Sequence, residues 1–111
     1  MNLLVTGGYG FIGSNFITHI WNIDSLTYAA SLDRLSEEIK KSKRYNFVKC
    51  DINDHEVIKK LVKDNNINLI VHFAAESHVD NSINETAPFV RSNILGVHNL
   101  LELVRGKKEY D

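Results

Sequence analysis

The fold is decided by the stretch Leu3-Leu4-Val5-Thr6-Gly7-Gly8-Tyr9-Gly10-Phe11-Ile12-Gly13. A short apolar run, typical of a buried parallel strand, passes into a glycine-rich turn and then into a helical pattern. Gly8, Gly10 and Gly13 fit G-x-G-x-x-G, and Gly7, Gly10 and Gly13 fit the looser G-x-x-G-x-x-G. Such glycines allow a sharp turn, close approach of a pyrophosphate, and close packing of helix on strand. The stretch therefore predicts a dinucleotide-binding turn whose helix start faces the phosphates, and a turn without a ligand is the alternative.

The composition limits the classes of protein and of site. The chain has 111 residues, enough for one modest domain, and a formal net charge of −1 with both signs interspersed. It therefore predicts no nucleic-acid partner and no membrane partner. No apolar run approaches the ~20 residues of a membrane span, and the N-terminus lacks the basic region and the small-residue cleavage site expected of a secretory signal. The single cysteine, Cys50, fits a cytoplasmic location, and the scattered histidines predict no metal site.

Strands and helices alternate along the chain, a pattern typical of an α/β fold. Strands are expected at residues 2–6, 21–24, 45–50 and 68–73. Helices are expected at about 10–20, 31–41, 53–65 and 88–105. We expect a Rossmann-type parallel sheet in the order 3-2-1-4, flanked by helices and incomplete beyond the fourth strand.

Apolar side chains at helical spacing predict which helix faces are buried. A capping box of Asn53 and Glu56 is expected to start the third helix, and Asn65-Asn66 to end it. The expected inner faces comprise Phe11, Ile12, Phe16, Ile17 and Ile20 in the first helix, Val57, Ile58, Leu61 and Val62 in the third, and Phe89, Ile94, Val97, Leu101 and Val104 in the last.

Asp24 ends the second expected strand, where dinucleotide folds hold an acid that hydrogen-bonds the adenosine ribose. No Arg or Lys stands beside it, so its carboxylate would repel a 2′-phosphate and favours NAD over NADP. Only ten residues separate Gly13 from Asp24, whereas about 20 are usual. Either the helix and strand are unusually short, or a piece of chain is absent near Ile20-Trp21. The alternative is that Asp24 is an aspartate in a surface turn. Asp33 lies at the usual distance from the glycines, but the apolar residues around it are spaced for a helix, so we keep Asp24 as the ribose-binding acid.

Polar residues in and after the third and fourth expected strands are of two kinds, those expected in the core and those expected to face a ligand. His72 lies within the fourth strand and is expected to be a hydrogen-bonded core histidine, and Cys50 a small core residue. Residues 74–78 leave the carboxyl end of that strand, where ligands bind in open α/β sheets. Ser92 and Asn93 interrupt the last helix and either reach a ligand or face solvent.

Tyr45 and Lys49 match a Tyr-x-x-x-Lys pair, in which an ammonium group lowers the pKa of a phenol. That pair works on a helix, and on a strand the two Cα atoms lie about 13 Å apart. We therefore predict no catalytic role for it.

Three segments resemble the N-terminal part of the extended short-chain dehydrogenase/reductase family. Residues 6–15 are similar to the nucleotide loop shared by its sugar-nucleotide epimerases, decarboxylases and dehydratases. Two further segments are more selective, since Asp24-Ser25-Leu26-Thr27-Tyr28-Ala29 resembles the D-x-L-T-Y-A segment of the 4,6-dehydratases, and Ala74-Ala75-Glu76-Ser77-His78-Val79-Asp80 resembles their A-A-E-S-H-V-D segment. The resemblance covers nearly the whole chain.

The resemblance implies NAD as the cofactor and extends the site beyond the glycines of the turn. Ser77 would also face the sugar nucleotide, and Asp51 would accept a hydrogen bond from the adenine amine. The expected cofactor-binding residues are Gly7, Gly10, Phe11, Ile12 and Gly13 at the pyrophosphate, Asp24, Ser25, Leu26 and Thr27 at the adenosine ribose, Asp51 and Ile52 at the adenine, and Phe73, Ala74, Ala75, Glu76, Ser77 and Ser92 on the ribose and nicotinamide side.

For a full-length protein the resemblance implies a lyase of nucleotide-sugar metabolism acting on a dTDP-sugar. Hydride would pass from C4 of the hexose to NAD, water would leave across C5–C6, and hydride would return to C6. The catalytic Thr-Asp-Glu segment and Tyr-x-x-x-Lys pair of the family would lie beyond Asp111. Residues 1–111 would then be an NAD-binding portion, inactive alone and without catalytic residues. A sugar-nucleotide epimerase or decarboxylase, and a non-catalytic NAD-binding module, are the alternatives.

Two further expectations concern assembly and sequence departures. Full-length relatives are typically homodimers through helices of this region, so a homodimer is expected. A fourth strand with no neighbour would expose an apolar edge and favour poor solubility or self-association. The arginine that follows H-V-D in the family is Asn81 here.

Overall fold

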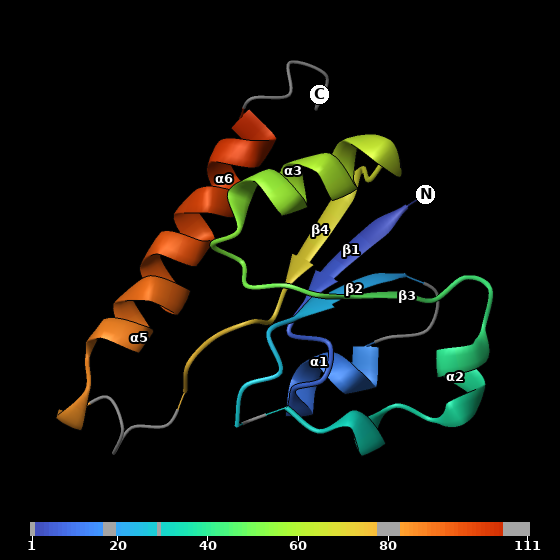
Figure 1. Cartoon of the computed structure of the whole chain (residues 1–111), viewed down its shortest axis with the longest axis horizontal. Coiled ribbons are helices and arrows are strands. Elements are labelled where there is room, and N and C mark those ends of the chain that lie inside the picture. Colours follow the sequence, from blue (N-terminus) through green and yellow to red (C-terminus); the bar gives the residue numbers. More distant parts are fainter. Residues whose placement is uncertain (1, 17–19, 29, 78–82, 106–111) are drawn as a thin grey trace.

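The computed structural model describes residues 2–16, 20–28, 30–77 and 83–105 (Figure 1). Within these residues, no helix combines the length and the apolar character needed to cross a membrane. The elements are β1 (Leu3–Thr6), α1 (Phe11–Phe16), β2 (Trp21–Asp24), the 3-10 turn η1 (Leu32–Arg34), α2 (Glu37–Lys41), β3 (Asn46–Lys49), α3 (His55–Asp64), β4 (Leu69–His72), α5 (Ala87–Val90), the π-helical segment η2 (Arg91–Gly96) and α6 (Val97–Arg105).

The four strands form one parallel sheet in the order β3-β2-β1-β4, which confirms the predicted topology. The register places Val5 opposite Asn22 on one side and Val71 on the other, and Asn22 opposite Phe47. Each strand begins and ends within one residue of its expected bounds. Because all the strands run in the same direction, their carboxyl ends meet at one edge of the sheet (Figure 1).

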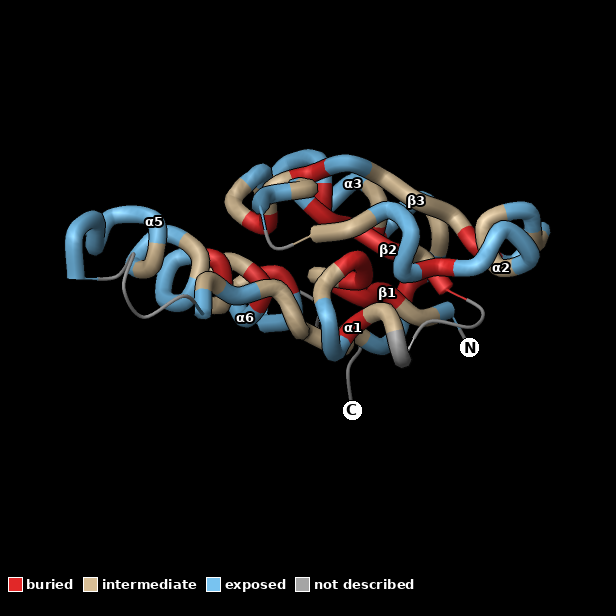
Figure 2. Tube along the Cα trace, turned by 90° about the horizontal axis from the view of Figure 1, so that it is seen from below, coloured by how far each residue is buried: buried red, intermediate tan, exposed pale blue. Residues whose placement is uncertain are grey.

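Two apolar clusters cover the two faces of the sheet, because successive side chains of a strand point to opposite faces. Leu4 belongs to the cluster that packs against α3 and α6, and Val5 to the cluster that packs against Tyr9 and Leu35. Figure 1 shows α3 and α6 together, apart from α1 and α2. In Figure 2 the buried positions concentrate in the sheet, whereas α5 is largely exposed.

The first helix is short, and its expected inner face is wrong at two positions. Phe11 is 78% exposed and Ile12 is 67% exposed, whereas Ile20, just before β2, is buried. The buried cluster on this face of the sheet includes Tyr9, from the glycine turn, and Leu35, directly after η1. Residues 17–19, including the predicted core residue Ile17, and the Phe16 side chain lie outside what the structure describes.

Residues 31–41 form η1 and α2, not the single helix that was expected. Leu35 is in an extended conformation between them, with φ −100° and ψ 131°, and is only 2% exposed. Ser36 then caps α2, because its hydroxyl accepts a hydrogen bond from the Ile39 amide at 3.3 Å. Burial of Leu35 and the capping preference of Ser36 together divide the segment.

The capping box predicted for α3 is not formed, because Asn53 does not occupy the N-cap position. Asp54 occupies the N-cap position of the helix. Asn53 instead donates its backbone and side-chain N–H groups to Asp51 Oδ1 at 2.8 and 2.9 Å. The expected end of the helix is confirmed, with Asn65 at the C-cap and Asn66 at a positive φ of 50°.

The last helix is continuous from α5 through η2 to α6, but its buried face differs from the predicted one. Gly96, Leu100 and Leu103 face the core. A Cβ atom at Gly96 would collide with the Ile52 side chain, so the helix approaches the sheet through a residue without a side chain. The apolar residues expected inside and found exposed are Val57 in α3 and Ile94, Leu101 and Val104 in the last helix.

Candidate functional site

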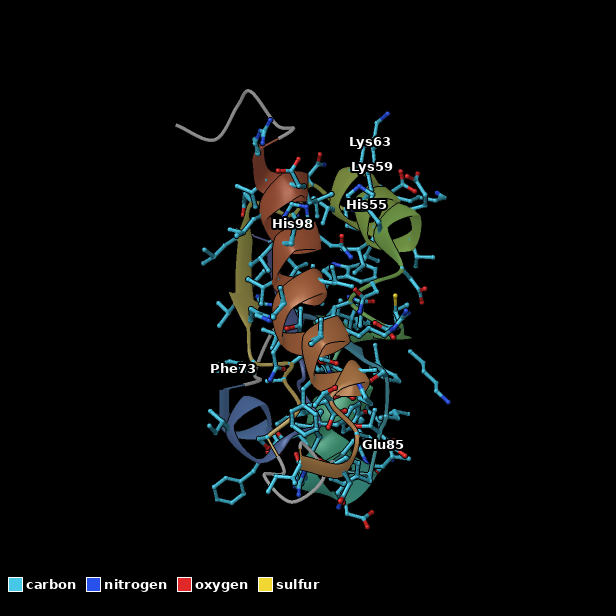
Figure 3. The ribbon with its side chains drawn as sticks, turned by 90° about the vertical axis from the view of Figure 1, so that its left-hand side faces the viewer. His55, Lys59, Lys63, Phe73, Glu85 and His98 are labelled. Atoms are coloured by element: carbon cyan, nitrogen blue, oxygen red, sulfur yellow. The ribbon has the colours of Figure 1, made fainter. Side chains whose placement is uncertain are left out.

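A pocket of about 240 Å³ lies at the carboxyl ends of the strands. Ligands of open parallel sheets bind at this edge, outside the strand ends. Figure 3 shows Phe73, one of its lining residues, just beyond the end of β4. The predicted residues that line it are Gly7, Gly10, Asp24, Ser25, Thr27, Asp51, Ile52, Phe73, Ala74, Ala75, Glu76 and Ser92.

Gly7 shapes the turn that follows β1. It has a φ of +69°, and a Cβ atom there would lie 2.7 Å from the Ala74 nitrogen. Its N–H donates to the Ile23 carbonyl at 2.9 Å, and its carbonyl accepts from the Gly10 N–H at 3.0 Å. Glycine is therefore required both by the backbone conformation and by the close passage of the segment after β4.

The helix that follows the turn contributes less to the pocket than expected. Phe11 and Ile12 do not line it, and Gly13 is buried behind the turn, where a Cβ atom would collide with the Gly7 carbonyl oxygen. α1 has only six residues. Leu26 and Ser77 also lie outside the pocket lining.

Asp24 is a buried carboxylate at the pocket wall, so the alternative of a surface-turn aspartate is wrong. Its Oδ2 accepts the Tyr9 N–H at 2.9 Å and its Oδ1 accepts the Leu26 N–H at 2.8 Å. Leu26 itself has a positive φ of 56°, a left-handed conformation that is uncommon for a residue other than glycine. Each carboxylate oxygen has a second lone pair, so Asp24 retains the capacity to accept hydrogen bonds from a ribose.

Asp51 lies just beyond the end of β3, beside the guanidinium group of Arg91, a residue that was not predicted to belong to the site. Arg91 Nη2 is 3.5 Å from Asp51 Oδ2, and the Arg91 carbonyl accepts from Asn53 Nδ2 at 3.2 Å. Partial burial favours a higher pKa for Asp51, but the hydrogen bonds from Asn53 and the charge of Arg91 outweigh it and lower that pKa below its ordinary value. The carboxylate is therefore ionised and acts only as an acceptor at neutral pH.

The segment after β4 is held by two side chains. His72 Nδ1 lies 2.5 Å from Thr6 Oγ1, and Thr6 Oγ1 also accepts the Ala74 N–H at 3.2 Å. Burial lowers the pKa of His72, so a neutral ring accepting from the Thr6 hydroxyl fits this geometry. The prediction of a hydrogen-bonded histidine is confirmed.

Asn93 resolves a question that the sequence left open, because its side chain binds backbone. Its Nδ2 donates to the Glu76 carbonyl and its Oδ1 accepts the Glu76 N–H, both at 2.8 Å. This pair fixes one wall of the pocket against η2. The preceding residue, Ser92, lines the pocket itself.

Five lining residues were not among those predicted. Pro88 and Arg91 come from the last helix, whose buried face differs from the predicted one. Ile23, Ala30 and Cys50 are small or apolar residues, and nothing in the sequence marks such residues as ligand-binding. Cys50 donates from Sγ to the Asp51 carbonyl at 3.2 Å. Burial, together with the nearby Asp54 carboxylate, raises the pKa of the Cys50 thiol to about 11, which keeps it neutral. Among the described residues no group of three metal-ligating side chains occurs.

Comparison with known proteins gives one family and a consistent set of relatives. The model of the GDP-mannose 4,6-dehydratase family matches residues 4–111. A dTDP-glucose 4,6-dehydratase of Salmonella typhimurium is 45% identical over 113 residues, covering 95% of this chain and 31% of that protein. The chain thus spans about a third of the length of the curated relatives that it matches.

Solved structures agree with this comparison. A dTDP-glucose 4,6-dehydratase from Streptomyces venezuelae, solved with NAD bound, superposes with a TM-score of 0.85 at 38% identity, covering 93% of this chain and 35% of that one. A UDP-glucose 4-epimerase from Stenotrophomonas maltophila, also solved with NAD, superposes with a TM-score of 0.79 at 31% identity, covering 95% of this chain and 33% of that one. The same nucleotide-binding fold therefore occurs in a dehydratase and in an epimerase.

Proposed function

The chain belongs to the GDP-mannose 4,6-dehydratase family, and on this premise we propose that it is the N-terminal, NAD-binding part of a dTDP-glucose 4,6-dehydratase. The observation that carries the proposal is the pocket itself. It combines the glycine turn after β1 with a carboxylate at the end of β2 and another at the end of β3. A diphosphate, a ribose and an adenine need these three kinds of group in this order across the sheet.

The residues present fit a dinucleotide. Gly7 and Gly10 expose backbone at the pocket without a Cβ, which suits close approach of a pyrophosphate. Asp24 retains lone pairs for ribose hydroxyls, and Asp51 can accept from an exocyclic amine. A buried carboxylate at the ribose would repel the 2′-phosphate of NADP, so NAD is the expected cofactor.

In the proposed reaction bound NAD⁺ accepts a hydride from the sugar and returns it. The residues of this chain bind and orient that cofactor. Ala74, Ala75 and Glu76 would face its ribose and nicotinamide side. Ser77 is exposed and outside the pocket lining, and we assign it to the sugar nucleotide. The acid and base groups of the reaction would come from chain beyond residue 111, which is consistent with relatives about three times as long.

A cytoplasmic homodimer is the proposed form of the full-length enzyme. The exposed apolar side chains Ile94, Leu101 and Val104 of the last helix support an assembly that covers them. A sugar-nucleotide epimerase is the second candidate, because the epimerase neighbour shares the fold at 31% identity. The segments at residues 24–29 and 74–80 favour the dehydratase.

The experiment is to incubate the longest natural polypeptide that contains this chain with dTDP-glucose and NAD⁺, and to measure the mass of the product by mass spectrometry. A dehydratase yields a sugar nucleotide lighter by one water, whereas an epimerase yields one of unchanged mass. Residues 1–111 alone are expected to bind NAD⁺ and to release no 4-keto-6-deoxy product. A full-length protein that turns over no sugar nucleotide but still binds NAD⁺ would favour the non-catalytic module.

Asp24→Asn tests the cofactor assignment separately from turnover. The amide keeps the size of the carboxylate but must turn an N–H group toward the Tyr9 or the Leu26 amide. We expect NAD⁺ to bind about tenfold more weakly, which corresponds to about 1.4 kcal/mol. Discrimination against NADP⁺ should also fall. An unchanged preference between NAD⁺ and NADP⁺ would remove Asp24 from the ribose site.

A further inference from the structure

Tyr9, between two glycines of the turn, has each of its polar groups paired. Its N–H donates to Asp24 Oδ2 at 2.9 Å, and its carbonyl accepts from the Ser31 N–H at 3.2 Å and from Arg34 Nη1 at 2.8 Å. Its hydroxyl accepts from the Tyr45 hydroxyl at 3.1 Å. The residue is 3% exposed, so its side chain belongs to the core.

Asn22 is a fully buried polar residue in the middle of β2, a position that a parallel strand normally fills with an apolar side chain. Its Oδ1 accepts the Gly8 N–H at 3.1 Å, and its Nδ2 donates to the Tyr45 hydroxyl at 3.0 Å. A buried amide is costly unless its groups are hydrogen-bonded, and no buried side-chain polar atom among the described residues lacks a partner.

The Tyr45 hydroxyl is the centre of this network. It accepts from Asn22 Nδ2 and donates to the Tyr9 hydroxyl, so it supplies the acceptor that the Asn22 amide needs while Asn22 Oδ1 accepts the Gly8 N–H. The Gly8 N–H points inward to Asn22 Oδ1, and the Tyr9 N–H points inward to Asp24 Oδ2. The backbone of Gly7 and Gly10 on either side of them faces the pocket.

We propose that Asn22 and Tyr45 are positioning residues for the diphosphate of the dinucleotide. Neither lines the pocket. Asn22 holds the Gly8 N–H inward, and Tyr45 holds both the Asn22 amide and the Tyr9 hydroxyl, which fixes the direction of the remaining turn backbone before the cofactor binds. This inference rests on the proposed function, because it assumes that the turn receives a diphosphate.

Loss of the Tyr45 hydroxyl would release the amide as well as remove two bonds. Without the hydroxyl, Asn22 Nδ2 loses this acceptor inside the core, which is costly for a buried donor. The Asn22 side chain lowers that cost by moving toward another acceptor or toward water, and this movement takes Oδ1 away from the Gly8 N–H. The effect therefore reaches the diphosphate site from a side chain that does not touch it.

The test compares ADP with adenosine as probes in the longest natural polypeptide that contains this chain, with and without Tyr45→Phe. Only ADP carries a diphosphate, so a displaced turn lowers the affinity for ADP and leaves the affinity for adenosine unchanged. We expect ADP to bind about tenfold more weakly to the variant and adenosine to change by less than about twofold. Val62→Ala is the matched control, because Val62 is 1% exposed in α3, away from the turn. It should destabilise the protein and leave the ratio of the two affinities unchanged.

Amide hydrogen exchange supplies a readout that needs no ligand. In Tyr45→Phe the Gly8 and Tyr9 amides should exchange at least about tenfold faster, whereas the Ile58 amide, bonded to the Asp54 carbonyl in α3, keeps its rate. Equal weakening of ADP and adenosine, or unchanged Gly8 exchange, would overturn the positioning role alone. A wild-type protein that binds neither ADP nor NAD⁺ would instead overturn the proposed function.

Discussion

Gly7 illustrates how single residues decide this site. Its positive φ and the 2.7 Å that would separate a Cβ atom from the Ala74 nitrogen leave no alternative to glycine. The glycine pattern identified this position from the sequence because the left-handed turn is a local constraint, whereas the close passage of Ala74 is visible only in the structure. Arg91 could not be identified in the same way, since its contact with Asp51 joins residues 40 positions apart.

Gly7→Ala should lower the free energy of unfolding by at least about 2 kcal/mol, because a left-handed backbone and a collision with backbone atoms add together. Gly10→Ala is the matched control, since its nearest contact would be the Gly7 oxygen at 3.2 Å. We expect Gly10→Ala to lose under about 1 kcal/mol of stability and to lose NAD⁺ affinity instead. Chemical denaturation of both variants checks this. Equal stabilities would contradict the account of the turn.

Burial of the Cys50 thiol predicts that the stability of the protein decreases at high pH. Burial raises the pKa of its thiol from 9.0 to about 11, so the unfolded chain releases the proton first as pH rises. The contribution of Cys50 to stability is complete below pH 9 and decreases between pH 9 and 11. In the same window the rate of thiol alkylation of the native protein should rise steeply. Alkylation at pH 8 as fast as in denatured protein would show that the thiol is neither buried nor protonated.

At the scale of elements, the sequence predicted the strands better than the helix faces. A four-residue buried strand is recognised by its own apolar run, as in β1 and β4. The inner face of α6 depends instead on Gly96, which carries no apolar signal yet brings the helix against Ile52. The spacing of the apolar residues therefore predicts Leu101 and Val104 on the inner face, each one residue beyond the buried Leu100 and Leu103.

A pair of neighbouring leucines tests this corrected face of α6. Leu100 is 6% exposed and Leu101 is 62% exposed. Leu100→Ala should destabilise the protein by about 2–5 kcal/mol, since it leaves a cavity in the core. Leu101→Ala should change stability by less than about 0.5 kcal/mol. Thermal unfolding of the two variants, measured on the monomeric chain, distinguishes the faces, and a larger loss in Leu101→Ala would restore the face predicted from the sequence.

At the scale of the whole molecule, topology and site location followed from the sequence because both depend on element order. Alternating strands and helices impose a parallel sheet, and a parallel sheet gathers its carboxyl ends at one edge. Gly7, Asp24 and Asp51 therefore meet at one pocket although they are far apart in the chain. The buried pairing of Asn22 with Tyr45 could not be predicted, because a single sequence does not specify which polar groups meet in a core.

NAD binding at this pocket can be observed by an NMR titration of the isotopically labelled chain with NAD⁺. We expect saturable shifts of the backbone amides of Gly7, Gly10, Ser25 and Asp51, with α3 unaffected. Shifts confined to α3 or to the exposed side of α6, or none at saturating NAD⁺, would contradict it.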